Sequence, residues 1–213
     1  MKSIYAITPP NEKLENLLKQ VDSLLDAGIT LFQYRSKENN LNKIKNEASS
    51  LLETIKRKNG KLIINDFPEI AIEIGADGFH LGLADYLNKK NQLFLKNNTN
   101  LINENYIKGF SCKWNLEILE NPPEDIIHWD YLAVGSFFET NTKLNVSMPP
   151  SKEIMMQAPL RTNKTLYAIG GISNKNITSL KMLGYKKFAI SKGLFTNRPN
   201  EIEEIIKINN EKD

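Results

Sequence analysis

The chain has 213 residues, of which 40% are hydrophobic and 25% are charged, as is typical of one globular domain around one core. The 28 Lys and Arg residues against 25 Asp and Glu residues leave a formal charge of +3 that is spread along the chain, so nucleic acid is not an expected partner. The single cysteine, Cys112, excludes an intrachain disulfide framework, and no apolar N-terminal segment predicts export or a membrane span. We therefore expect one domain over residues 1–213, located in the cytoplasm.

The first part of the chain alternates short apolar runs with amphipathic segments. Four runs predict strands, at residues 3–8, 31–34, 62–64 and 78–81. Three segments between them predict helices, at residues 14–25, 41–55 and 68–74. Pro68 suits the first turn of the third helix because its missing N–H would have no partner there, and Gly75 suits its end.

The second part repeats this alternation less regularly. Strands are predicted at residues 106–110, 131–134, 165–169 and 187–190. The polar stretch 88–105 has poor periodicity and predicts a weak helix plus a loop, whereas helices are expected after Cys112, from Ser173 or Asn174, and around Ile202 to Ile206. Residues 137–150 are longer than a turn needs and are a candidate binding loop or lid.

Eight strands alternating with helices predict a closed (β/α)8 TIM barrel, an α/β fold, and fit it better than an open doubly wound sheet. The length of the chain is near the lower limit of this fold, about 200 residues. Polar residues stand where the strands end and the helices begin. They are Gln33, Arg35, Lys37, Asn65, Asp66, Asp85, Ser111, Thr140, Thr142, Lys143, Gly170, Gly171 and Ser191. In a barrel these positions share one rim, which is where this fold builds active sites.

The charges on this rim indicate a ligand. Asp66 and Asp85 are anions, whereas Arg35, Lys37 and Lys143 are cations. A magnesium ion explains why both signs of charge are present, because it binds carboxylate and phosphate oxygens while Arg and Lys bind the remaining phosphate charge. The expected ligand is therefore a Mg2+ pyrophosphate. The segments Gly170–Gly171 and Ser191–Gly193 offer backbone N–H groups to a second, single phosphate.

Each of these residues also has an ordinary structural interpretation. An Asp after a strand often caps a helix, a double glycine marks many turns, and alternating polar residues at a strand end often face solvent. His80 sits in an apolar run and is expected to be a hydrogen-bonded core residue, and His128 is expected at the surface. The functional interpretation depends on the clusters recurring at the same end of successive strands.

Seven segments, in order and at these spacings, resemble the thiamin-phosphate synthase family, and the resemblance covers essentially the whole chain. They are YAIT (5–8), QYRSK (33–37), IINDFPEIAIEIGADGFHLGLAD (63–85), GFS (109–111), DYLAVGSFFETNTK (130–143), AIGGISNKNI (168–177) and FAIS (188–191). The resemblance implies a barrel enzyme that joins 4-amino-5-hydroxymethyl-2-methylpyrimidine pyrophosphate to a thiazole phosphate and releases pyrophosphate and thiamin phosphate. It also implies dissociative, Mg2+-assisted chemistry: pyrophosphate leaves first, and the thiazole nitrogen attacks the resulting cation.

The resemblance also implies roles for the rim residues. The pyrimidine pyrophosphate would be bound by Gln33, Arg35, Lys37, Asn65, Ser111 and Lys143, of which Arg35, Lys37, Ser111 and Lys143 would form the catalytic set that neutralises the leaving group. Magnesium would be held by Asp66 and Asp85. The thiazole phosphate would be bound by Thr140, Thr142 and the backbone around Gly171, Ile190 and Ser191.

Three departures from the family pattern keep alternatives open. Leu83 stands where many relatives have Gln, Lys113 stands where many have His, and residues 144–151 lack the usual glycine. A related thiazole tautomerase and a non-catalytic binding protein for thiamin precursors are therefore the rival interpretations. A homodimer is possible, and neither the oligomeric state nor the preferred thiazole phosphate tautomer follows from the sequence.

Overall fold

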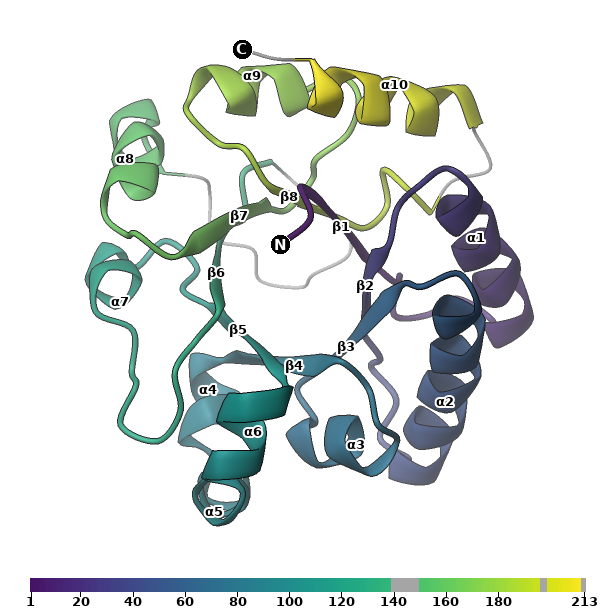
Figure 1. Cartoon of the computed structure of the whole chain (residues 1–213). Helices are drawn as coiled ribbons and strands as arrows, with labels where there is room; N and C mark the ends of the chain where they lie inside the picture. Colours follow the sequence, from purple (N-terminus) through teal and green to yellow (C-terminus); the bar gives the residue numbers. More distant parts are fainter. Residues whose placement is uncertain (139–149, 196–198, 212–213) are drawn as a thin grey trace.

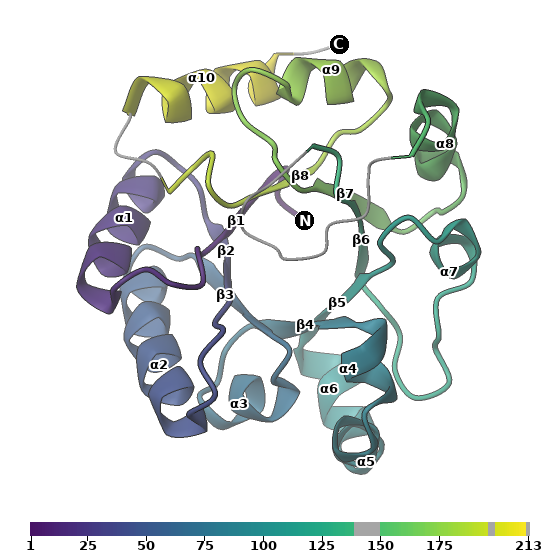
Figure 2. The ribbon, with the colours of Figure 1, turned by 180° about the vertical axis from the view of Figure 1, so that it is seen from behind.

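The computed structural model describes residues 1–138, 150–195 and 199–211. Eight parallel strands form a closed barrel in chain order, in which β8 pairs with β1. The strands are β1 (Ile4–Ile7), β2 (Leu31–Tyr34), β3 (Lys61–Asn65), β4 (Gly78–Gly82), β5 (Ile107–Ser111), β6 (Tyr131–Gly135), β7 (Thr165–Ile169) and β8 (Phe188–Ile190). Figures 1 and 2 show the strand ring end-on from its two sides, with the helices outside it. The predicted (β/α)8 barrel is confirmed.

The helices cover the outer face of the barrel. They are α1 (Leu14–Asp26), α2 (Leu41–Arg57), α3 (Pro68–Glu73), α4 (Leu83–Leu87), α5 (Lys89–Asn97), α6 (Thr99–Asn105), α7 (Leu116–Glu120), α8 (Lys152–Gln157), the 3-10 turn η1 (Ala158–Leu160), α9 (Ile177–Met182) and α10 (Pro199–Asn210). α1 and α2 bury residues at helical spacing, such as Leu17, Val21 and Leu24 on α1, against the strands. This outer layer is the main hydrophobic core.

Side chains alternate between the two faces of each strand, as the pleat requires. On β2, Phe32 and Tyr34 belong to the outer core with the helices, whereas Leu31 belongs to a second, inner cluster that fills the barrel. The inner cluster also contains Tyr5, Tyr131 and Tyr167. Because the period is two residues, every second side chain of a strand points into the barrel. The last inward-pointing side chain at the carboxyl end of each strand therefore opens onto the rim.

The polar stretch 88–105 differs from the prediction. It forms two helices, α5 and α6, directly after the short helix α4, where a weak helix plus a loop was expected. Asn88 begins α5 by accepting a hydrogen bond from the Lys90 N–H at 2.9 Å, and Leu95 and Ile102 are the fully buried apolar anchors of α5 and α6. The apolar periodicity of this segment is weak because each of the two helices buries one apolar side chain, which is too few to produce a clear helical pattern in the sequence.

Two other helices differ from the prediction: one was not predicted, and one begins later than predicted. Helix α8 was missed because none of its residues is buried, so it carries no apolar periodicity. Helix α9 begins at Ile177, later than the predicted Ser173 or Asn174, because the Ser173 N–H bonds to the Asn176 side chain at 2.9 Å and the Ile177 N–H bonds to the Ser173 carbonyl at 3.0 Å. This turn lengthens the loop between β7 and α9.

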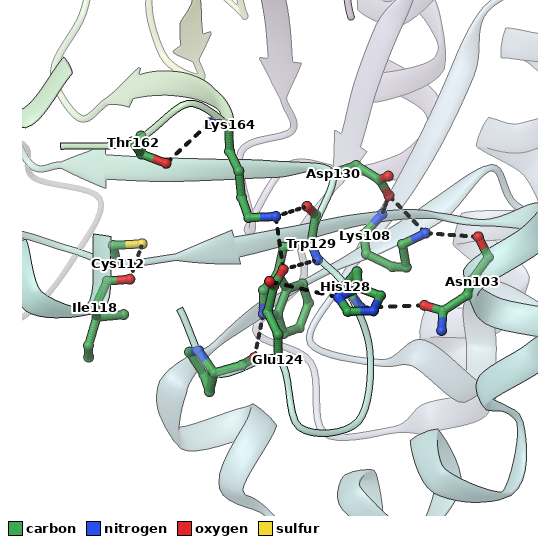
Figure 3. A network of polar contacts seen from close by, with 11 residues as sticks. Asn103, Lys108, Cys112, Ile118, Glu124, His128, Trp129, Asp130, Thr162 and Lys164 are labelled. Carbon is green, nitrogen blue, oxygen red and sulfur yellow. Dashed lines mark hydrogen bonds and ion pairs between the residues drawn. The ribbon is translucent and has the colours of Figure 1, made fainter. Parts of the chain in front are cut away.

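A polar network joins the amino ends of β5, β6 and β7, opposite the rim (Figure 3). The Lys108 side chain is 5% exposed, and its Nζ lies 3.0 Å from Asp130 Oδ2, which also accepts the Lys108 backbone N–H at 2.7 Å. Lys108 Nζ donates to the Asn103 carbonyl at 3.3 Å, which ties α6 to the barrel. Nearby, Lys164 Nζ pairs with Glu124 at 2.9 Å.

Asp130→Ala should lower the free energy of unfolding by about 2 kcal/mol, because it removes the carboxylate that pairs with the buried Lys108 ammonium and accepts the Lys108 N–H. Urea denaturation measures this loss. The matched control is Glu15→Ala, which removes an exposed, solvent-screened pair with Lys19 and should leave the free energy of unfolding essentially unchanged. Equal costs for the two variants would show that the network does not stabilise the barrel.

Candidate active site

A cavity of about 700 Å3 opens at the carboxyl ends of the strands. Its lining includes residues from the ends of β2 to β8 and from the loops that follow them. Eight of the predicted site residues with described positions are among them: Gln33, Arg35, Asn65, Asp66, Asp85, Ser111, Gly171 and Ser191. Gly170 also lines it. The closed barrel therefore brings residues far apart in sequence to one site.

The two carboxylates reach the cavity in different ways. Asp66 follows β3 and adopts a φ of +66°, in the left-handed region that is sparsely populated by residues other than glycine and is often found at functional sites. Its N–H donates to the His80 carbonyl at 2.9 Å, which fixes it to β4. Asp85 lies in the first turn of α4, where Oδ2 is 3.3 Å from the Gly82 N–H. Asp85 therefore has the capping contact of the structural interpretation and also faces the cavity.

Cations line the same cavity. Arg35 is held through its backbone by buried Thr8, whose Oγ1 accepts the Arg35 N–H at 2.9 Å. Lys113, Lys175 and Lys192 come from the loops after β5, β7 and β8. With three carboxylates, Asp66, Asp85 and Glu201, and several cations, the cavity has the mixed charge that suits a metal-bound polyphosphate.

The floor of the cavity is formed by Gln33 and His80. Gln33 is 3% exposed, and its Nε2 donates to Tyr5 Oη at 2.8 Å. His80 is 6% exposed, and its Nδ1 lies 3.1 Å from Tyr131 Oη, inside the barrel. Polar groups thus extend from the rim into the inner cluster.

A second polar region lies between the loops after β7 and β8. Gly170 and Gly171 have φ of +103° and +69°, and Gly193 packs so closely that a Cβ there would lie 2.5 Å from the Ile172 carbonyl oxygen. Within the described ranges, the N–H groups of Gly171, Ile172, Lys192 and Gly193 donate to no other group. Neighbouring backbone N–H groups that open onto a cavity are a common means of binding a phosphate.

Comparison with known proteins identifies the family. The model of a family described as thiamine monophosphate synthase matches residues 4–194. The chain belongs to this family. A thiamine-phosphate synthase of Nitrosospira multiformis is 34% identical over 195 residues, which are 92% of this chain and 79% of that protein. A thiamine-phosphate synthase of Saccharophagus degradans is 32% identical over 197 residues, 92% of this chain and 86% of that protein.

Two further comparisons concern length and fold. A thiamine-phosphate synthase of Prochlorococcus marinus subsp. pastoris is 33% identical over 97% of this chain, which spans only 55% of that relative. A thiamine phosphate pyrophosphorylase from Pyrococcus furiosus has the same fold, with a TM-score of 0.75 at 21% identity over 97% of this chain and 95% of that one. The expected family, the transferase class and the formation of thiamin phosphate are confirmed.

The other predicted site residues either do not line the cavity or lie outside the described residues. Lys37 is exposed and is not among the residues that line the cavity. Ile190 is 1% exposed and its side chain packs in the outer core, so only its backbone can face a ligand. Thr140, Thr142 and Lys143 lie outside the described residues, as does most of the segment that lacks the family's glycine.

The positions of several residues outside the predicted set also bear on the site. His80 lines the cavity although it was expected only to be a core residue, and its two-residue spacing from Gly82 was the signal that it faces inward. Lys113 also lines the cavity, whereas Leu83 is exposed and does not. His128 is exposed, as expected. Cys112 is buried, which raises the pKa of its thiol to about 12 and makes it unreactive.

Gly170→Ala should lower activity by about tenfold or more, because it disturbs the loop after β7 that lines the cavity. A Cβ at Gly170 would lie 2.1 Å from Ser136 Oγ, so one of the two loops must move. Steady-state kinetics with varied thiazole phosphate measures the effect. Gly184→Ala is the matched control, since Gly184 has a φ of +91° with nothing within 4 Å of a Cβ. Similar losses in both variants would mean that backbone strain, and not the position of the loop, is responsible.

Proposed function

We propose that the cavity joins 4-amino-5-hydroxymethyl-2-methylpyrimidine pyrophosphate to thiazole phosphate by a dissociative, Mg2+-assisted reaction. The observation that carries this proposal is that Asp66, Asp85 and Arg35 line one cavity with the loops after β7 and β8. One part of the cavity suits a metal-bound pyrophosphate and the other suits a single phosphate. Two phosphorylated small molecules are therefore the substrates.

The two carboxylates fit a magnesium ion. Mg2+ prefers oxygen ligands, commonly uses one or two carboxylates, and completes its coordination with water and substrate phosphate oxygens. In the described part of the chain, no group of three or more His, Cys, Asp and Glu side chains could hold a metal, so substrate oxygens and water would have to complete the coordination. Asp66 and Asp85 would hold this ion, which neutralises pyrophosphate charge when it is bound.

The chain's own residues then position and release the leaving group. Arg35 binds pyrophosphate oxygens, and Ser111 donates a hydrogen bond from the end of β5. The C–O bond to pyrophosphate breaks and its electron pair leaves with the oxygen, while the aminopyrimidine delocalises the positive charge of the remaining methylene group. The thiazole nitrogen gives its lone pair to this carbon and forms the new C–N bond. No protein nucleophile is required.

Lys37 and Lys143 are proposed from the family pattern alone. Lys37 would have to move from its exposed position to reach a phosphate, whereas Thr140, Thr142 and Lys143 belong to a segment that the structure does not describe. A homodimer and a cytoplasmic location also stay predictions. In the described part of the chain, every helix is too short or too polar to cross a bilayer.

The reaction is tested by mixing the protein with both substrates and Mg2+ and measuring pyrophosphate and thiamin phosphate. Both products should form in equal amounts, stop with EDTA and resume with added Mg2+. Asp85→Asn keeps an acceptor for the Gly82 N–H but loses the charge, so turnover should fall by about 100-fold while stability changes little. Altered unfolding with unchanged turnover would leave Asp85 as only a helix cap.

Asp77→Asn is the matched control. Asp77 Oδ2 accepts the Leu62 N–H at 2.9 Å at the amino end of β3, outside the cavity lining. It loses the same charge and should keep its turnover and its Mg2+ dependence. Failure of the wild-type protein to form either product would favour the tautomerase or the non-catalytic binding protein.

A further inference from the structure

The loop after β5 places one lysine at the cavity in an uncommon backbone conformation. Lys113 lines the cavity and has a φ of +52°, in the left-handed region that residues other than Gly, Asn and Asp rarely adopt. Among the described residues other than glycine, only Asn59, Asp66 and Lys113 have a positive φ. Asn59 follows the end of α2, where such a residue commonly ends a helix, whereas Asp66 and Lys113 both line the cavity. Strained backbone of this kind is concentrated at binding and catalytic sites.

Contacts on both sides hold this turn in place. Cys112 is buried, and its N–H donates to a carbonyl of β6 at 2.9 Å. Trp114 Nε1 donates to the Ser136 carbonyl at 3.0 Å, and the Trp114 ring packs against Phe137 with ring centroids 4.6 Å apart. The residues before and after Lys113 are therefore fixed to β6 and to the loop that follows it. The turn between them holds Lys113 at the cavity.

The strand register places this turn beside Asp85. Ser111, the last residue of β5, pairs with Gly82 of β4. The Gly82 N–H contacts Asp85 Oδ2 at 3.3 Å, so the loop after β5 leaves the barrel next to one of the two carboxylates proposed to hold Mg2+. A pyrophosphate bound to that ion would therefore lie close to the turn that carries Lys113.

The charge of Lys113 is free to bind a ligand. Its side chain is exposed, and among the residues that the structure describes its ammonium group forms no hydrogen bond or ion pair. Lys37 does not line the cavity, so Arg35 and Lys113 are the cations that the loops after β2 and β5 supply to it. An ammonium group binds phosphate oxygens as a compact point charge.

We propose that Lys113 is a catalytic residue that binds the oxygens of the leaving pyrophosphate from a position that is fixed before the substrate binds. When the C–O bond breaks, its electron pair leaves with the pyrophosphate oxygen. The Lys113 ammonium stabilises this added negative charge and transfers no proton. The inference rests on the proposed function, and it assigns to the loop after β5 the role that the family pattern gives to Lys37 in the loop after β2.

The positive φ allows an experiment that separates function from structure. Glycine adopts this conformation without strain, so Lys113→Gly should unfold at the same urea concentration as the wild-type protein or at a higher one. Its kcat/KM for the pyrimidine pyrophosphate, with Mg2+ and saturating thiazole phosphate, should nevertheless fall by about 30-fold. Lys113→Gln should show the same loss, whereas Lys113→Arg keeps the charge and should lose no more than about fivefold. Wild-type kcat/KM in the Gly and Gln variants would overturn the proposal.

Two matched controls test the backbone and the charge separately. Asn59→Gly removes a side chain from the same kind of backbone conformation, at a φ of +56°. Lys61→Gln removes an exposed lysine at the amino end of β3. Neither residue lines the cavity, so both variants should keep the wild-type kcat/KM. A loss in Lys61→Gln equal to that in Lys113→Gln would mean that the overall charge of the protein is responsible, and would overturn the proposal.

Titration calorimetry with Mg2+ and inorganic pyrophosphate tests the contact without the reaction. Lys113→Gln should raise the Kd for pyrophosphate by about tenfold and leave the KM for thiazole phosphate unchanged. The opposite result, an unchanged Kd with a raised KM, would place Lys113 at the other substrate and overturn the proposal.

The outcomes also separate this inference from the proposed function. If the wild-type protein forms thiamin phosphate and Lys113→Gln forms it at the same rate, the role of Lys113 fails and the proposed function stands. If the wild-type protein forms neither product, but Lys113→Gln weakens pyrophosphate binding, the proposed function fails and the contact of Lys113 with pyrophosphate stands.

Discussion

The parallel pairing of eight strands in a closed ring decides which side chains meet in this protein. Each strand runs in the same direction, so its carboxyl end reaches the same rim, and the two-residue pleat sends alternate side chains inward. Gln33 and His80 face the cavity for this reason, whereas Ile190 packs among the helices. A shift of one residue in the pairing of a strand would exchange these faces and remove its polar groups from the cavity.

The two ends of the barrel use the same residue types for different purposes. At the amino ends, Asp77 and Asp130 accept strand N–H groups, and Asp130 also holds the buried Lys108 ammonium. At the carboxyl ends, Asp66 and Asp85 line an open cavity with Arg35. Chemistry and stabilisation are therefore separated along the barrel axis, as in other enzymes of this fold.

The order of the strands and the polar positions after them could be predicted from sequence, because both depend on local apolar runs and on spacing. Helix α8 could not, since it buries no residue, and neither could the start of α9, which depends on the Asn176 side chain. For the site, the prediction that polar residues after the strands share one rim agrees with the structure, in which Asp66, Asp85 and Arg35 line one cavity. The contacts of His80 with Tyr131 could not be predicted, because they join β4 to β6 across the barrel interior.

We propose that the carboxyl ends of two strands jointly bind one divalent ion together with a diphosphate. The most direct test is a crystal structure of the protein with Mn2+ and inorganic pyrophosphate, in which anomalous scattering locates the metal. We expect one ion in the cavity that contacts carboxylate oxygens of both Asp66 and Asp85 and oxygens of the pyrophosphate. Pyrophosphate bound without a metal, or an ion that contacts neither carboxylate, would contradict this account.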